Sequence, residues 1–150
     1  MNAWRSPNPV LVVDDDPDAR DMLVEYLQFQ GFNVHEASNG GAAIALASTL
    51  RPRVILMDDL ATGDLDGLET TRRLRANAST KHAIIVALMR RALMTDRNEA
   101  HRAGCDGFIS KPFDLNTLAE YIDRIVGSVG RQTAPHTLSL AKIRSRQVIR

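Results

Sequence analysis

Short apolar runs alternate along this chain with longer segments whose apolar residues recur every three or four positions. The runs are typical of strands buried on both faces, and the longer segments are typical of amphipathic helices. The pattern predicts strands at residues 10–13, 32–37, 54–57, 83–88 and 107–110. It predicts helices at residues 17–30, 42–50, 68–76 and 95–103, with a last helix that begins near residue 115 and ends near residue 127.

Capping and turn residues separate these elements. Asp16 followed by Pro17 is a typical helix start, and Gly31 is a typical helix end. The run 39–41 predicts a turn, and residues 1–8 predict a loose lead-in. Five strands that alternate with five helices predict an α/β domain with a parallel sheet and helices on both faces.

Composition and charge add a boundary near the carboxyl end. The 150 residues are 44% hydrophobic and 25% charged, and no apolar run is long enough to cross a membrane. Residues 128–150 carry five basic side chains and no acidic one, whereas residues 1–127 carry 14 basic against 18 acidic side chains. We therefore expect a body at 9–127 and a flexible basic tail at 128–150. A partner- or nucleic-acid-binding tail is the alternative. With one cysteine and no signal-peptide pattern, a cytoplasmic location is expected.

Acidic residues follow two of the buried strands. Asp14 and Asp15 follow the first strand, Asp58 ends the third, and Lys111 follows the fifth. Parallel strands bring their carboxyl ends to one edge of the sheet, so we expect these side chains to converge there. Three carboxylates suit Mg²⁺, and a carboxylate beside Mg²⁺ and a lysine can act as a nucleophile toward a phosphoryl group.

These residues and their surroundings resemble a known family. The stretches 12–17, 52–58 and 108–113, together with Asp66-Gly67, resemble the receiver domain of two-component response regulators. The resemblance covers about residues 9–127. It implies a doubly wound, flavodoxin-like fold: five parallel strands in the order 2-1-3-4-5, flanked by five helices.

The resemblance also implies roles for individual residues. Asp14 and Asp15, with Asp58, match the acidic residues that hold Mg²⁺. Lys111 matches the lysine that contacts the phosphoryl group, before a proline that is usually joined by a cis bond. Phe108 stands at the position of a rotating aromatic switch residue. The face formed by the fourth helix, fifth strand and fifth helix would bind the downstream protein target.

The position of the phosphoacceptor depends on the direction of counting. Counted forward from Pro52, the family's spacing places the phosphoacceptor at Asp58. Counted back from Asp66-Gly67, the same spacing places it at Asp59. The chain therefore has one extra residue in this interval. Loops absorb insertions more readily than buried strands, so we expect Asp58 to be the acceptor and keep Asp59 as the alternative.

The chain departs from the family pattern at three points. The loop after Asp59 lacks the usual proline, and Met89 stands where the family has a threonine or serine. A thioether cannot donate a hydrogen bond to a phosphoryl oxygen, so the second switch position is altered. Arg90 adds a long cation, which would either supply the lost contact or guard the entrance.

Three functions are consistent with these features. The leading one is a signalling module, not an enzyme, that takes a phosphoryl group from a histidine kinase or phosphotransfer protein with Mg²⁺. A degenerate receiver that binds partners without phosphorylation is the alternative, motivated by Met89 and Arg90. A small phosphohydrolase is the third, but no residues are left over for a substrate cap. We expect a monomer or weak dimer, with neither membrane insertion nor nucleic-acid binding by the body.

Overall fold

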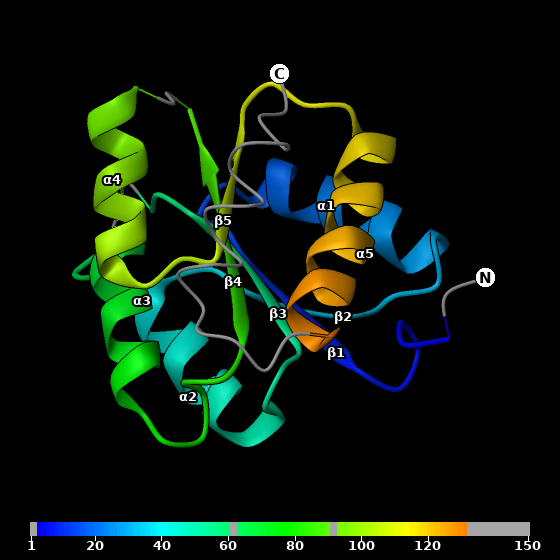
Figure 1. The fold of residues 1–150 in the computed structure, drawn as a ribbon, viewed down its shortest axis with the longest axis horizontal. Helices are drawn as coiled ribbons and strands as arrows, with labels where there is room; N and C mark the ends of the chain where they lie inside the picture. The colour runs from blue at the N-terminus through cyan, green and yellow to red at the C-terminus, as the bar shows by residue number, and fades with distance from the viewer. Residues whose placement is uncertain (1–2, 61–62, 91–92, 132–150) are drawn as a thin grey trace.

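One five-stranded parallel sheet lies between two layers of helices (Figure 1). The structure is a computed structural model that describes residues 3–60, 63–90 and 93–131, with side chains to residue 128. The strands are β1 (Pro9–Val13), β2 (Asn33–Ala37), β3 (Val54–Asp58), β4 (Ile84–Met89) and β5 (Gly107–Ser110). The helices are α1 (Pro17–Phe29), α2 (Gly40–Leu50), α3 (Gly67–Ala76), α4 (Met94–Ala103) and α5 (Leu115–Arg131). The sheet order is β2-β1-β3-β4-β5, as expected.

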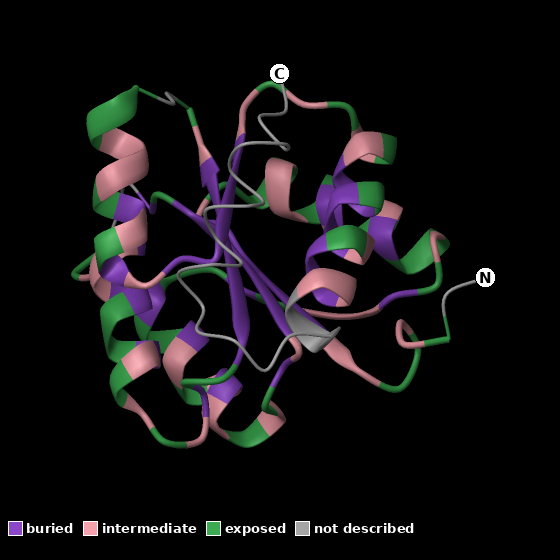
Figure 2. Ribbon diagram, in the orientation of Figure 1, coloured by how far each residue is buried: buried purple, intermediate pink, exposed green. Residues whose placement is uncertain are grey.

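Both faces of the sheet are buried, which explains the fully apolar strand runs (Figure 2). Alternate residues of each strand point to opposite faces. Val10 and Leu56 pack on the side covered by α1 and α5. Leu11 and Ile55 pack on the side covered by α2, α3 and α4. Within the described residues, no helix combines the length and apolar content that crossing a membrane requires.

Two glycine-containing segments are helical where the sequence predicts a turn or an end. Helix α2 begins at Gly40, and Asn39 caps it by accepting a hydrogen bond from the Ala42 amide at 2.8 Å. A Cβ on Gly40 would lie 2.3 Å from Thr70 Oγ1, so this glycine serves the close packing of α2 on α3. Helix α5 continues through Gly127 to Arg131. Of the predicted basic tail, residues 132–150 lie outside the described residues.

The amino-terminal segment packs against the body, so the expectation of a loose lead-in is wrong. Trp4 Nε1 donates a hydrogen bond to Asp123 of α5 at 3.0 Å, and Arg5 forms an ion pair with the same carboxylate. The Arg5 guanidinium also lies 4.2 Å from the ring centre of Phe32 and donates to the Gln30 carbonyl. These contacts tie Trp4 and Arg5 to the end of α1 and to the middle of α5.

Arg75 connects α3 to the segments that precede β4 and β5. Its guanidinium donates hydrogen bonds to the carbonyls of Lys81, Ala83 and Gly104 and to the Asp106 carboxylate at 2.6 Å. Asp106 is buried and also accepts from the Ile85 amide at 2.9 Å. The pair therefore joins α3, β4 and the turn before β5.

Arg75→Ala should lower the free energy of unfolding by about 3 kcal/mol, because it leaves the Asp106 carboxylate buried without its cation. Urea unfolding measures this change. Arg72→Ala is the matched control, since Arg72 is an exposed α3 arginine paired with Glu69, and it should change stability by less than about 0.5 kcal/mol. Equal effects of the two substitutions would contradict the role given to Arg75.

Candidate functional site

The carboxyl ends of β1, β3 and β5 meet at one edge of the sheet. Parallel pairing of β1 with β3 aligns Val13 with Met57, so the next residues, Asp14 and Asp58, come side by side. Carboxylate oxygens of Asp14, Asp15 and Asp58 lie within 4.8 Å of one another. Lys111 reaches this cluster from the end of β5, and its Nζ donates to Asp58 Oδ1 at 2.7 Å. The structure thus brings together the four residues that the sequence placed at this edge.

Asp14 is the most constrained of these carboxylates. Its residue is 1% exposed, and its Oδ1 accepts a hydrogen bond from the Asp16 amide at 2.9 Å. Its Oδ2 is buried with no hydrogen-bond partner in the described part of the chain. Burial, followed by repulsion from Asp58, raises the pKa of Asp14 above its ordinary value of 3.8, although the Asp16 amide opposes this. A buried carboxylate oxygen with no donor is a candidate cation ligand.

Asp58 and Asp59 have different surroundings. Asp58 ends β3 with a side chain that is 2% exposed, whereas the Asp59 side chain is 49% exposed. The Asp59 carboxylate faces Arg90, whose Nε lies 3.8 Å from its Oδ2. Partial burial and the neighbouring Asp58 raise the pKa of Asp59, and Arg90 partly offsets them. Asp58 therefore belongs to the acidic cluster, and Asp59 belongs to a pair at its rim.

The motif Asp66-Gly67 shapes the loop behind Asp58. Asp66 caps α3 by accepting a hydrogen bond from the Glu69 amide at 2.8 Å. Gly67 donates its amide to the Asp59 carbonyl, and a Cβ at this position would lie 2.3 Å from the Asp58 carbonyl oxygen. Only glycine permits this approach of α3 to the end of β3. The motif therefore allows α3 to pack against the end of β3, the strand that carries Asp58.

The two expected switch positions lie on neighbouring strands. Met89 is the half-buried last residue of β4, and its carbonyl accepts the Lys111 amide at 2.7 Å. Phe108 is buried on β5, with the Arg97 guanidinium of α4 at 5.1 Å from its ring centre. The Lys111-Pro112 peptide bond is cis. The Arg97 contact carries no signal in the sequence, because it joins segments that only the fold brings together.

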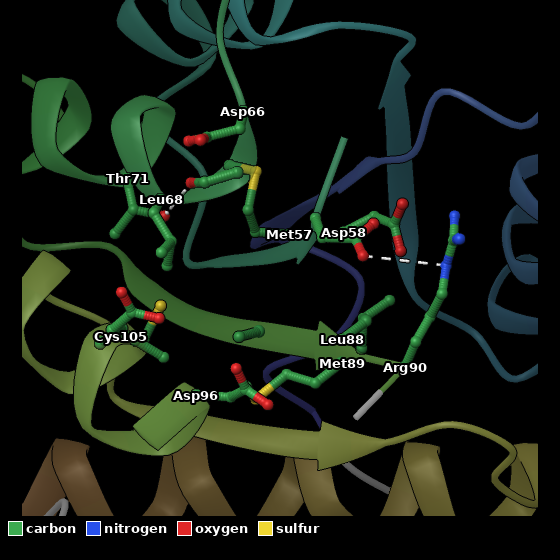
Figure 3. Close-up of a pocket in the computed structure, with 15 residues that line it drawn as sticks. Met57, Asp58, Asp66, Leu68, Thr71, Leu88, Met89, Arg90, Asp96 and Cys105 are labelled. Atoms are coloured by element: carbon green, nitrogen blue, oxygen red, sulfur yellow. Dashed lines mark hydrogen bonds and ion pairs between the residues drawn. The ribbon is translucent and has the colours of Figure 1, made fainter. Parts of the chain in front are cut away.

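A hollow of about 440 Å³ opens beside Asp58, between α3, α4 and the ends of β3 and β4 (Figure 3). Its floor is apolar, with Met57, Leu88 and the buried Cys105. Burial raises the pKa of the Cys105 thiol to about 12, so this part of the floor is neutral. The acidic residues of its lining are Asp58, Asp59, Asp66, Asp96 and Glu99. Among the described residues that line it, Arg90 is the one basic side chain.

Known proteins share this sequence pattern. The family model of the response regulator receiver domain matches residues 10–123. Protein PilH of Pseudomonas aeruginosa is 33% identical over 117 residues, which are 78% of this chain and 96% of PilH. The transcriptional regulatory protein SrrA of Staphylococcus aureus is 32% identical over 142 residues, which are 95% of this chain. The matched part spans 56% of SrrA, about half of that protein.

Solved structures share the fold. Chemotaxis protein CheY4 of Vibrio cholerae matches with a TM-score of 0.74 and 30% identity, over 78% of this chain and 97% of that one. The receiver domain of sensor histidine kinase PA1611 from Pseudomonas aeruginosa, described with magnesium coordinated in its active-site cleft, matches with a TM-score of 0.74 and 31% identity. That match covers 81% of this chain and 98% of the PA1611 domain. The acidic sheet edge, the strand order and these matches agree: the chain belongs to the response regulator receiver domain family, the phosphorylation-controlled modules of two-component signalling.

Proposed function

We propose that this chain accepts a phosphoryl group on Asp58, with Mg²⁺ held by Asp14, Asp15 and Asp58. The observation that carries the proposal is the cluster itself: three carboxylates within 4.8 Å, with the Lys111 ammonium 2.7 Å from Asp58. Receiver domains interact with histidine kinases or phosphotransfer proteins, so a phosphohistidine is the donor that this site would meet.

The acidic residues fit a magnesium ion. Asp14 Oδ2 is buried without a donor, and the oxygens of three carboxylates converge on one point. Mg²⁺ prefers carboxylate oxygens and water as ligands, and it keeps sites open for phosphate oxygens. When bound, it supplies positive charge that offsets both the carboxylates and the phosphoryl oxygens. The magnesium in the related PA1611 receiver domain supports this assignment.

The transfer requires one nucleophile and positive charge around it. A carboxylate oxygen of Asp58 attacks the phosphorus, a P–O bond forms, and the P–N bond to the donor histidine breaks. The electron pair of the P–N bond stays on the imidazole nitrogen. Lys111 holds Asp58 in place in the ground state and can donate to a phosphoryl oxygen as negative charge builds there.

Burial and charge favour Asp58 over Asp59 as the acceptor. Asp58 lies at the strand end, within reach of Lys111 and the other two carboxylates. Asp59 is turned toward Arg90 at the rim. An extra residue in the following loop accounts for the conflict in spacing, although residues 61–62 of that loop lie outside the described residues.

Output would pass through the surface formed by α4, β5 and α5 to a protein target. The buried Phe108 and the half-buried Met89 connect this surface to the site and are the proposed switch positions. The degenerate-receiver alternative is not favoured, because the four residues needed for phosphoryl chemistry converge. The proposal also includes a cytoplasmic location and a monomer or weak dimer. It divides the chain into a body at 9–127 and a basic tail at 128–150, the first residues of which continue α5 to Arg131.

Asp58→Asn should abolish phosphorylation by acetyl phosphate and Mg²⁺, because it removes the nucleophile, whereas Asp59→Asn should retain it. Intact-mass spectrometry detects the gain of one phosphoryl group on the full chain. Wild type without Mg²⁺ is the control for the metal. An adduct that survives in Asp58→Asn and disappears in Asp59→Asn would assign the acceptor to Asp59.

Asp14→Asn should raise the free energy of unfolding of the Mg²⁺-free protein by about 1–2 kcal/mol at neutral pH, because it removes one of two adjacent buried charges. The raised pKa means that the contribution of Asp14 to stability is full below pH 3.8 and is lost as pH rises through the raised value. The same substitution should weaken Mg²⁺ binding by more than about 100-fold.

Urea unfolding at several pH values and calorimetric Mg²⁺ titration measure the two effects of Asp14→Asn. Asp16→Asn is the matched control, since asparagine also caps helices and Asp16 lies outside the cluster. A destabilised Asp14→Asn variant that still binds Mg²⁺ would contradict the assignment.

Met89→Thr should strengthen the coupling between the site and the output surface, because a hydroxyl can donate to a phosphoryl oxygen and a thioether cannot. Hydrogen exchange in α4 and β5, with and without the phosphoryl mimic beryllofluoride, measures that coupling. We expect the ligand-dependent change to be about fivefold larger in the variant. Exchange that is the same with and without the mimic in both proteins would contradict it.

A further inference from the structure

An ion pair spans the ends of β3 and β4 beside the proposed phosphoacceptor. Arg90 follows β4, and its Nε lies 3.8 Å from Oδ2 of Asp59, the residue after Asp58. In Figure 3 the dashed line that ends on Arg90 marks this pair. Both side chains are largely exposed, at 62% and 49%. The pair is therefore long and accessible to water, and such pairs are held weakly.

The hollow beside Asp58 contains a charge imbalance that phosphorylation would increase. Among the described residues, five carboxylates and one guanidinium line it, and Asp58, Asp59 and Arg90 border the same space. A phosphoryl group on Asp58 replaces one carboxylate charge with about two negative charges and adds acceptor oxygens. An arginine binds such a group through two parallel hydrogen bonds, which is stronger than a loose contact with one carboxylate oxygen.

We propose that Arg90 exchanges partners on phosphorylation: it leaves Asp59 and binds the phosphoryl group on Asp58, so that Asp59 competes with the phosphoryl group for the guanidinium. This inference rests on Asp58 being the acceptor. Lys111 already contacts Asp58 from the β5 side, and Arg90 supplies the second cation from the β4 side. The extra acidic residue after Asp58 then sets how readily the phosphorylated state is stabilised.

Competition gives the two partners opposite effects, which a purely structural ion pair would not. Removing Arg90 takes a cation from the phosphoryl group, and removing the Asp59 charge releases that cation. Arg90→Ala should weaken binding of beryllofluoride about tenfold, the size of one charge-assisted hydrogen bond. Asp59→Asn should strengthen it about threefold, since the competing contact is a weak exposed pair. In the Arg90→Ala background, Asp59→Asn should strengthen binding less than it does in wild type, because only the direct repulsion between Asp59 and Asp58 then remains. An equal gain in both backgrounds would mean that Asp59 does not act through Arg90, and the exchange would be wrong.

The experiment is calorimetric titration of the full chain with beryllofluoride at saturating Mg²⁺. Arg72→Ala and Glu69→Gln form the matched control, because this exposed pair on α3 lies at 3.2 Å and outside the hollow. Both controls should leave the affinity unchanged. Arg90→Lys should fall between wild type and Arg90→Ala, because lysine keeps the charge without the planar fork. Thermal unfolding identifies any variant that fails to fold, and Arg90→Gln then replaces Arg90→Ala.

Three further results would contradict the exchange of partners by Arg90. If Arg90→Ala and Asp59→Asn both weaken binding, the pair is structural and the exchange is wrong. If Arg90→Ala binds beryllofluoride normally but is phosphorylated faster by acetyl phosphate, Arg90 guards the entrance instead, and the exchange is again wrong. If wild type binds no beryllofluoride at all, the proposed phosphorylation of Asp58 fails, and the exchange fails with it.

Discussion

The burial of Asp14 beside Asp58, at one edge of the sheet, is the constraint on which the rest of the candidate site depends. The register of β1 on β3 fixes the two strand ends next to each other, and the apolar residues behind them hold both strands in the core. The carboxylates cannot separate without disrupting the sheet. Lys111 compensates one of the two buried charges, and half-buried Asp15 adds a third. The remaining negative charge suits a divalent cation, which would in turn bind phosphate oxygens.

The sequence predicts this edge because its signals are local. Continuous apolar runs identify strands that are covered on both faces, and alternation with helices makes the sheet parallel. Parallel strands then carry Asp14 and Asp58 to the same edge, whichever loops connect them. The positions of Asp16 and Pro17 at the start of α1 are also local, since capping depends on residues within one turn. All five strands and all five helices follow from such patterns, with bounds that differ by a few residues.

Features that depend on contacts between distant segments could not be predicted. Arg75 resembles its solvated neighbours on α3 until the fold brings Asp106 and three carbonyls to it. Gly40 resembles a turn residue, but it is required by the approach of α2 to α3. Trp4 packs on α5 across most of the chain length. The Asp59–Arg90 pair has the same origin, because only the pairing of β3 with β4 brings these two residues together.

The central claim is that Asp14, Asp15 and Asp58 hold one divalent ion beside Lys111. A crystal structure of the protein soaked in Mn²⁺, a substitute for Mg²⁺ with a measurable anomalous signal, tests this claim directly. The account predicts one anomalous peak among the three carboxylates, with metal–oxygen distances of about 2.1 Å. An anomalous map with no peak at this edge, at Mn²⁺ concentrations that saturate other receiver domains, would contradict it.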